Sequence, residues 1–259
     1  MSKEASEKIH RLDWLRKLFL ELDRLAKPIM GIEAWDDAVC VEFGGKRLVV
    51  SCDGPYKKRL VMKSALIHAS TDVVVKGARP LFALDTLTGS EKDILEMAKS
   101  LKGQAMEMGI PILGGNTMIE DVEARANIFV VGELITEKPI RDSGGEKGDR
   151  LLIVGEPLWG SQAERFAKAK RLFGVWFRIL GSDVGIHASK DVTKGGLIAT
   201  VTEIAEKSGL GYELEGGIPY HLSRNLDNFL ISADGKNAKK ILDICATDGL
   251  DARVIGGLR

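Results

Sequence analysis

Short apolar runs of strand length alternate with amphipathic stretches of helix length along the whole of this 259-residue chain. One helical stretch shows the pattern clearly: Ser90 and Asp93 resemble a capping box at its start, and Gly109 closes it. Ile94 and Leu101 lie on its apolar face. Because both kinds of element recur in both halves, the sequence predicts an α/β to α+β fold.

The other predicted elements follow the same alternation. Helices are expected over residues 9–27, 63–76, 90–108, 162–180, 197–207 and 237–247. Strands are expected over residues 38–43, 47–52, 81–86, 110–113, 127–135, 150–154, 229–232 and 252–255. The polar, glycine-rich stretch 142–149 is the best candidate for a linker. We therefore expect an N-terminal domain over residues 1–147 and a C-terminal domain over residues 148–259.

The first predicted helix, within residues 1–28, has an unusually wide apolar face. Its apolar residues recur at three- and four-residue spacing and are Ile9, Leu12, Leu15, Phe19, Leu22 and Leu25, and Pro28 ends the helix. We expect this face to dock on the domain or on a partner subunit.

Composition excludes several classes of protein. The formal net charge is zero, so the chain has no global basic field for nucleic acid and no polybasic run for a membrane surface. No apolar run reaches the roughly 18 residues of a transmembrane helix, and the N-terminus lacks the apolar core of a secretory signal. The three cysteines form no ligand pair and suit a reducing compartment, which predicts a cytoplasmic protein.

The segment from Ala188 to Gly209 combines several features of an anion site. A carboxylate at Asp191, a cation at Lys194 and bare backbone at Gly195–Gly196 come just before an amphipathic helix. Unpaired N–H groups and the helix dipole make such a helix start suitable for a phosphate. The alternative is an ordinary helix start with an aspartate cap and a tight glycine turn.

Four further polar features stand near predicted strands and helices. Asp36–Asp37 precedes a strand, Asp53 ends the next one, Asp72 lies in an apolar helix, and Gly114–Thr117 follows a buried strand. Mg²⁺ binds through one or two carboxylates together with substrate phosphates, so these groups fit a nucleotide–Mg²⁺ site. Each also has an ordinary explanation as a turn former or a solvated side chain. No P-loop sequence is present.

Taken in order, these segments resemble the aminoimidazole ribonucleotide synthetase-like (PurM-like) superfamily, which includes selenophosphate synthetase, thiamine-monophosphate kinase and the hydrogenase-maturation carbamoyl dehydratase. The segments that carry the resemblance are Gly31-Ile-Glu-Ala-Trp-Asp-Asp37, Ser51-Cys-Asp53, Ser70-Thr-Asp72 with the following Gly-Ala-Arg-Pro-Leu81, Gly114-Gly-Asn-Thr117 and Asp191-Val-Thr-Lys-Gly-Gly-Leu197. The last is similar to the superfamily's Asp-x-Thr-Arg-Gly-Gly-Leu motif. The resemblance leaves the subfamily open.

The resemblance implies a two-domain architecture. The N-terminal domain would have a mixed sheet that dimerises into a barrel and would bind ATP. A second α+β domain would follow, and the length of this chain predicts that it is shortened. The implied metal ligands are Asp37, Asp53, Asp72 and Asn116. The implied ATP-binding residues are Asp37, Asp72, Gly114, Gly115, Asn116, Thr117, Gly195 and Gly196. The implied catalytic residues are Asp191, which would orient the acceptor, and Lys194, which would face phosphate.

Two departures from the superfamily's motifs concern the implied site. Glu33 stands in the turn before Asp37 where the superfamily has a second glycine, and Asn116 replaces a common acidic residue. The resemblance implies a homodimeric, ATP- and Mg²⁺-dependent phosphoryl-transfer enzyme, a kinase or an ATP-driven synthetase, with a small-molecule acceptor. The alternative is an inactive dimeric relative that binds a nucleotide or a partner.

Overall fold

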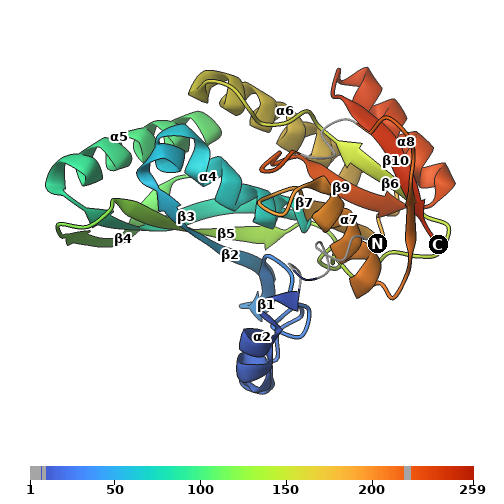
Figure 1. The fold of residues 1–259 in the computed structure, drawn as a ribbon, viewed down its shortest axis with the longest axis horizontal. Helices are drawn as coiled ribbons and strands as arrows, with labels where there is room; N and C mark the ends of the chain where they lie inside the picture. The colour runs from blue at the N-terminus through green and yellow to red at the C-terminus, as the bar shows by residue number, and fades with distance from the viewer. Residues whose placement is uncertain (1–6, 8–9, 219–222) are drawn as a thin grey trace.

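Two five-stranded sheets, one from each half of the chain, form the framework of the protein (Figure 1). The structure is a computed structural model that describes residue 7, residues 10–218 and residues 223–259. Helices and sheets in both halves confirm the predicted mixed α/β fold class. Within the described residues, no helix is both long and apolar enough to cross a membrane.

The N-terminal sheet is covered on one face by two helices. Its strand order is β1 (Val39–Phe43), β2 (Lys46–Lys57), β5 (Arg125–Leu134), β3 (Ala78–Gly89) and β4 (Ile112–Ile119), antiparallel except for the β3–β4 pair. Helices α4 (Lys58–Val75) and α5 (Glu91–Met108) pack on it. Ala126, Ile128 and Val130 alternate into the core, whereas Leu81 and Leu84 on β3 are about two-fifths exposed.

Helix α4 lies between the two halves of the protein. Every residue from Ser64 to Val75 is buried. Leu66 and Val73 belong to the core of the N-terminal sheet, whereas Ile67 and Val74 pack into the core of the C-terminal half. A helix that is apolar on all sides is a buried one, and the sequence of α4 fits that position.

Helix α4 is kinked at Ser64, whose backbone is not helical. The side chain of the buried Gln104 on α5 fills the gap in the hydrogen-bond ladder: its Oε1 accepts from the Leu66 N–H at 3.1 Å, and its Nε2 donates to the Val61 carbonyl at 2.6 Å. A buried backbone group without a partner is costly, so Gln104 stabilises the kink.

The C-terminal sheet is antiparallel and covered on both faces. Its order is β7 (Ala188–Asp191), β9 (Phe229–Ala233), β6 (Arg150–Val154), β10 (Ala252–Leu258) and β8 (Tyr212–Leu214). Leu152 and Ile231 face helices α6 (Gln162–Leu180) and α8 (Gly235–Thr247). Leu151 and Leu230 face α7 (Leu197–Lys207) on the other side. The consecutive apolar residues Leu151–Val154 in β6 and Phe229–Ile231 in β9 reflect this double coverage.

The N-terminal helical segment differs from the prediction. Instead of one helix over residues 9–27, the described part contains α2 (Asp13–Phe19), a 3₁₀ turn (Leu20–Leu22) and α3 (Asp23–Ala26), and Ile9 lies outside the described residues. Neither helix nor the turn has a buried residue, and Leu25 is 82% exposed. The expected docking of this apolar face on the domain is therefore wrong. Docking on a partner stays a prediction.

Three other elements were predicted wrongly or missed. The polar run Ala188–Asp191 forms strand β7, and Tyr212–Leu214 forms strand β8; neither strand was predicted. Gly114–Thr117 lies inside strand β4 rather than in a turn that follows a buried strand, and β4 is mostly exposed. Short polar strands carry no alternation of apolar residues, so the pattern could not reveal them.

Candidate metal and phosphate site

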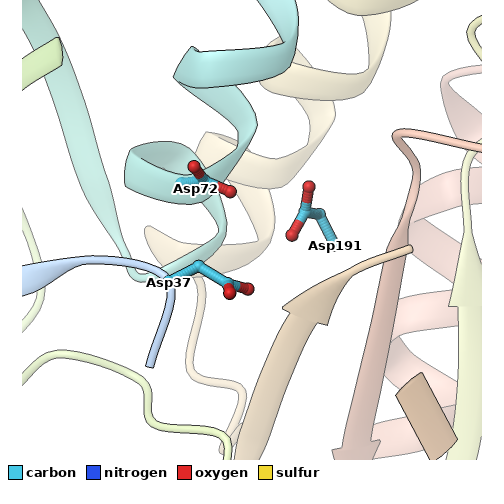
Figure 2. A group of neighbouring side chains, drawn as sticks. All are labelled: Asp37, Asp72 and Asp191. Carbon is cyan, nitrogen blue, oxygen red and sulfur yellow. The ribbon is translucent and has the colours of Figure 1, made fainter. Parts of the chain in front are cut away.

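Three carboxylates from distant parts of the sequence converge between the two halves of the protein (Figure 2). Asp37 precedes β1, Asp72 lies in α4, and Asp191 ends β7. One carboxylate oxygen of each lies within 4.8 Å of the others. The Asp37 side chain is 36% exposed, whereas Asp72 and Asp191 are buried.

Each of the two buried carboxylates has a hydroxyl partner. The Ser51 hydroxyl donates to Asp72 at 2.7 Å, and the Thr71 hydroxyl donates to Asp191 Oδ2 at 2.8 Å. The other Asp191 oxygen, Oδ1, is buried and has no hydrogen-bond partner within the described residues. A buried carboxylate oxygen without a partner is expensive, which indicates a missing positive ligand.

Burial and mutual repulsion disfavour the ionised forms of these three neighbouring carboxylates. Burial, and then the charges of Asp191 and Asp37, raise the pKa of Asp72 well above its ordinary value. Burial and the charge of Asp37 raise the pKa of Asp191 to about 7, although Lys190 and His68 oppose this. A bound cation would remove the repulsion and favour the ionised forms.

The donor set fits Mg²⁺. Carboxylate oxygens are the ligands of hard cations. Two oxygens on opposite sides of one Mg²⁺ ion lie about 4 Å apart, so the spacing of the cluster needs little closure. The unpartnered Asp191 Oδ1 supplies a ligand atom with no competing contact in the described structure.

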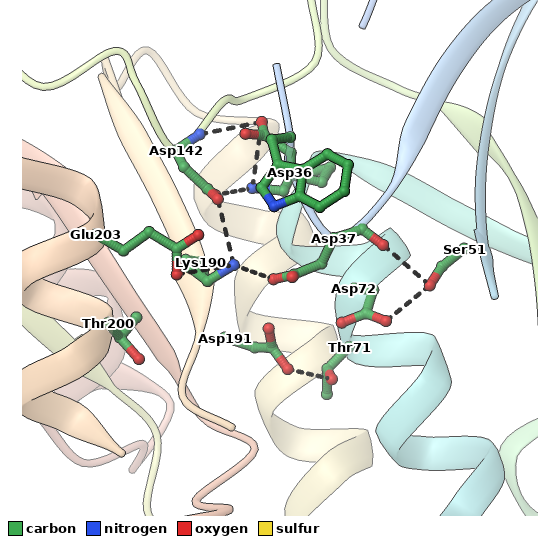
Figure 3. Close-up of polar contacts among 12 residues, drawn as sticks. Asp36, Asp37, Ser51, Thr71, Asp72, Asp142, Lys190, Asp191, Thr200 and Glu203 are labelled. Carbon is green, nitrogen blue, oxygen red and sulfur yellow. Dashed lines mark hydrogen bonds and ion pairs between the residues drawn. The ribbon is translucent and has the colours of Figure 1, made fainter. Parts of the chain in front are cut away.

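A network of buried charges lies behind the cluster (Figure 3). Lys190 forms ion pairs with Asp37, with Asp142 at 3.3 Å and with Glu203 at 3.5 Å. The Asp142 carboxylate, which is fully buried, also contacts Lys76 and, at 2.9 Å, Lys207. Sequence reasoning missed these partners, although Lys190 stands next to Asp191 and Asp142 opens the predicted linker.

The turn that carries Asp37 is held by the N-terminal helical segment. The Asp23 carboxylate accepts hydrogen bonds from the Ile32 and Glu33 N–H groups at 3.1 and 2.9 Å. A Cβ at Gly31 would lie 2.6 Å from the Asp23 carboxylate, so a side chain there is excluded. The backbone around Glu33 is thus fixed by α3 and replaces the glycine turn of the superfamily.

A cavity of about 320 Å³ opens beside the cluster. Its lining includes Asp37, Asp72, Asp53, Lys194 and His68. Asp53, a predicted metal ligand, lies in this cavity but outside the group of three carboxylates: it accepts from the Tyr56 hydroxyl at 2.6 Å and lies 3.5 Å from His68 Nε2. His68 Nδ1 is 2.6 Å from Asp227, so this buried histidine lines the site.

The start of α7 opens next to the same cavity. Gly196 is its N-cap and has no side-chain cap, so the alternative reading of Asp191 as a helix cap is wrong. Gly196 has φ +82°, and a Cβ there would lie 2.8 Å from the Ser223 carbonyl oxygen, so the position requires glycine. Lys194 and Gly195 are exposed at this helix start, as an anion site requires.

The Gly114–Thr117 segment lies elsewhere. Strand β4 is the edge strand of the N-terminal sheet opposite β1, and Asp37 directly precedes β1. Gly114, Gly115, Asn116 and Thr117 are all exposed. A single chain therefore does not bring Asn116 to the three carboxylates, and the roles of these four residues stay predictions.

Comparisons with known proteins agree with the fold. The sequence matches the family model of the AIR synthase related protein, N-terminal domain, over residues 35–134, and that of the C-terminal domain over residues 142–258. An uncharacterized protein of Methanocaldococcus jannaschii is 36% identical over 93% of this chain and 82% of that protein. A selenide, water dikinase of Desulfitobacterium hafniense is 26% identical over 89% of this chain and 77% of that enzyme.

A solved structure shows the same fold. AaThiL complexed with AMPPCP and TMP superposes with a TM-score of 0.64, 18% sequence identity, and coverage of 86% of this chain and 84% of that one. With both family models matched along the chain and the PurM-like fold seen in the structure, the protein belongs to the AIR synthase related, PurM-like family.

Proposed function

We propose that this protein is an ATP- and Mg²⁺-dependent phosphoryl-transfer enzyme that acts on a small metabolite. The observation that carries the proposal is the convergence of Asp37, Asp72 and Asp191 with one buried, unpartnered oxygen. Two similar proteins support the proposal. One relative is named selenide, water dikinase, and the structure of AaThiL, which has a similar fold, is complexed with AMPPCP.

In this proposal Asp37, Asp72 and Asp191 hold Mg²⁺. When bound, Mg·ATP supplies the phosphoryl group and the ion neutralises charge on its phosphates. The family resemblance implied that Asp191 orients the acceptor; its place beside Asp37 and Asp72 instead favours a role as a cation ligand. Asp53, held by the Tyr56 hydroxyl, is the carboxylate on the other side of the cavity, where it can bind a second ion or the acceptor.

The start of α7 provides the positive groups of the site. Lys194 lines the cavity and Gly195 is exposed beside it, whereas the Gly196 N–H donates to the Thr193 carbonyl at 3.0 Å and closes the turn into the helix. Such a helix start stabilises phosphate oxygens through its N–H groups and its dipole. Catalysis would then rest on positioning and charge stabilisation, as is usual for phosphoryl transfer.

We further propose a homodimer that forms through the uncovered face of the N-terminal sheet. Leu81, Leu84 and Leu113 are exposed on its strands, and together they are a typical interface for another copy. A dimer is also the arrangement in which Asn116 of one protomer could approach the site of the other. Light scattering of the purified protein measures the state directly, and a monomer at all concentrations would contradict the proposal.

The enzyme assay is ADP release from Mg·ATP in the presence of candidate acceptors. The proposed reaction breaks the bond between the bridging oxygen and the terminal phosphorus of ATP, forms a bond from that phosphorus to an acceptor oxygen, and releases the acceptor's proton. ATP binding without turnover under every acceptor tried would favour the inactive relative. Absence of ATP binding by calorimetry would contradict both hypotheses.

A further inference from the structure

The Asp37 carboxylate is the one member of the cluster whose side chain has no hydroxyl partner in the described structure. Asp72 and Asp191 are buried and accept hydrogen bonds from hydroxyl groups, whereas Asp37 is 36% exposed and stands in the turn before β1. Within the described residues, its side chain has a single partner, the ammonium group of Lys190. A metal ligand on a turn needs such an anchor to keep its orientation.

Lys190 is itself fixed in place. It is buried on β7 and forms ion pairs with Asp142 at 3.3 Å and with Glu203 at 3.5 Å, in addition to its contact with Asp37 (Figure 3). Burial lowers the pKa of Lys190, but the charges of these three carboxylates outweigh burial and hold the pKa well above its ordinary value. The lysine is therefore a charged donor whose position is set by its surroundings.

Strand β7 carries both this anchor and one of the ligands. Consecutive side chains of a strand point to opposite faces. Asp191 accordingly contacts Thr71 on α4, whereas Lys190 contacts Glu203 on α7 and Asp37 before β1. Lys190 thus ties a carboxylate of the N-terminal half to the strand of the C-terminal half that carries Asp191.

The network around Lys190 is balanced in charge without Asp37. It contains three ammonium groups and three carboxylates other than Asp37. The lysines are Lys76, Lys190 and Lys207, and the carboxylates are Asp36, Asp142 and Glu203. The negative charge of Asp37 is therefore left over to attract a cation.

We propose that Lys190 is a positioning residue of the cation site. Its ammonium group holds Asp37 Oδ2, so that Oδ1 faces the other two carboxylates and binds the ion. This inference rests on the proposed function, since it concerns the cation that this function requires.

Charge and position predict opposite effects of removing the lysine. A positive group near a metal ion repels it, so the loss of charge alone would make Lys190→Gln bind a divalent cation more tightly. The loss of the anchor would make the same variant bind more weakly, because Asp37 is no longer oriented. The inference predicts the second result.

The test is Mn²⁺ binding measured by electron paramagnetic resonance, with Mg²⁺ as the competitor, because both ions prefer oxygen ligands. Lys190→Gln should weaken Mn²⁺ binding by about tenfold or more. Lys190→Arg, which keeps a charged N–H donor, should bind Mn²⁺ more tightly than Lys190→Gln does. The matched control is Lys76→Gln, which should bind as wild type does: Lys76 is also buried and shares Asp142 with Lys190, but forms no ion pair with Asp37 among the described residues.

Two further variants separate positioning from folding. Lys190→Gln with Glu203→Gln removes one charge of each sign and keeps the network balanced, and it should lose as much Mn²⁺ affinity as Lys190→Gln alone. In a double-mutant cycle, adding Lys190→Gln to Asp37→Asn should cause no further weakening, because the lysine acts through Asp37.

Three results would each overturn the inference: equal or tighter Mn²⁺ binding by Lys190→Gln, the same loss of affinity in Lys76→Gln, or a further loss when Lys190→Gln is added to Asp37→Asn. Absence of both Mn²⁺ and Mg²⁺ binding by wild type would instead contradict the proposed function itself.

Discussion

At the scale of single residues, Asp72 is the group whose charge is hardest to explain without a cation. It is buried beside Asp37 and Asp191, and within the described residues its side chain accepts one hydrogen bond, from the Ser51 hydroxyl. We expect Asp72→Asn to weaken Mg·AMPPCP binding by about tenfold or more, because a charged ligand is lost. Calorimetry measures the change.

The same variant separates a metal ligand from a structural carboxylate. In the metal-free protein Asp72→Asn should leave the free energy of unfolding unchanged or raise it by about 1 kcal/mol, because repulsion from Asp191 and Asp37 is relieved. The control is Asp121→Asn, an exposed carboxylate of the same half. Asp23 is unsuitable because it holds the turn before Asp37. A metal-free variant less stable than wild type would contradict the assignment.

His68 gives a prediction on pH. Its folded pKa of about 10 exceeds the ordinary value of 6.5, so its protonation stabilises the fold fully below pH 6.5, and that contribution is lost as the pH rises toward 10. The stability difference between wild type and His68→Gln should therefore shrink across this range. Urea unfolding of both proteins at several pH values measures it. A difference that stays constant would mean that the imidazole is neutral throughout.

The sequence identified the individual motifs, but it did not show which of their side chains lie close together in the fold. Asp37, Asp72 and Asp191 were all singled out, yet spacing along a chain does not show which of five polar segments share a site. Asp53 was expected with them and instead lies across the cavity, held by Tyr56. Ser51, Thr71 and Lys190 contact the cluster and carry no signal of their own, because hydroxyls and lysines are common at such positions.

At the scale of elements, the kink of α4 depends on one side chain. Gln104→Met keeps the size of the side chain but leaves the buried Leu66 N–H without its Gln104 partner, and leaves the Val61 carbonyl with only the Ser100 hydroxyl at 3.2 Å. We expect a loss of about 1–3 kcal/mol in the free energy of unfolding, which is the cost of one unsatisfied buried group. Chemical denaturation measures it, with Lys102→Met on the exposed side of α5 as the control. Equal stability of the two variants would refute this role.

Elements with a periodic apolar face and clear caps were predicted well. Ser161 caps α6 with a complete capping box, Ser90 caps α5, and both helices were expected within one residue of their observed bounds. The start of α4 was missed by five residues because its first turn is polar and follows β2 without a break. The same reasoning fails for β7, whose four residues are buried by tertiary pairing rather than by apolar character.

At the scale of the whole molecule, Asp142 joins the two halves of the chain. Its carboxylate contacts Lys76, which directly follows α4, Lys190 from β7 and Lys207 from α7, and its backbone N–H donates to Asp36. The predicted linker therefore begins inside a buried charge network. Sequence composition could not show this, because a polar, glycine-rich stretch resembles a solvated connection whether or not its first carboxylate is buried.

Asp142→Asn should destabilise the protein by about 3–5 kcal/mol, because the buried Lys76 and Lys190 and the partly buried Lys207 lose a shared counter-charge. Burial raises the pKa of Asp142, but Lys190, Lys76 and Lys207 outweigh burial and hold it well below 3.8. The contribution is therefore present above pH 3.8 and is lost as the pH falls below it. Thermal and urea unfolding measure the stability gap, which is the difference in the free energy of unfolding between wild type and variant. The control is Asp183→Asn, at an exposed position. A gap near zero at neutral pH would show that the network is not what joins the halves.

The most direct test of the central claim is a structure of the protein with Mg²⁺ and AMPPCP. We predict one ion held by the carboxylates of Asp37, Asp72 and Asp191, with the terminal phosphate of the nucleotide facing Lys194 at the start of α7. A nucleotide bound elsewhere, or three carboxylates that carry no ion at saturating Mg²⁺, would contradict the account.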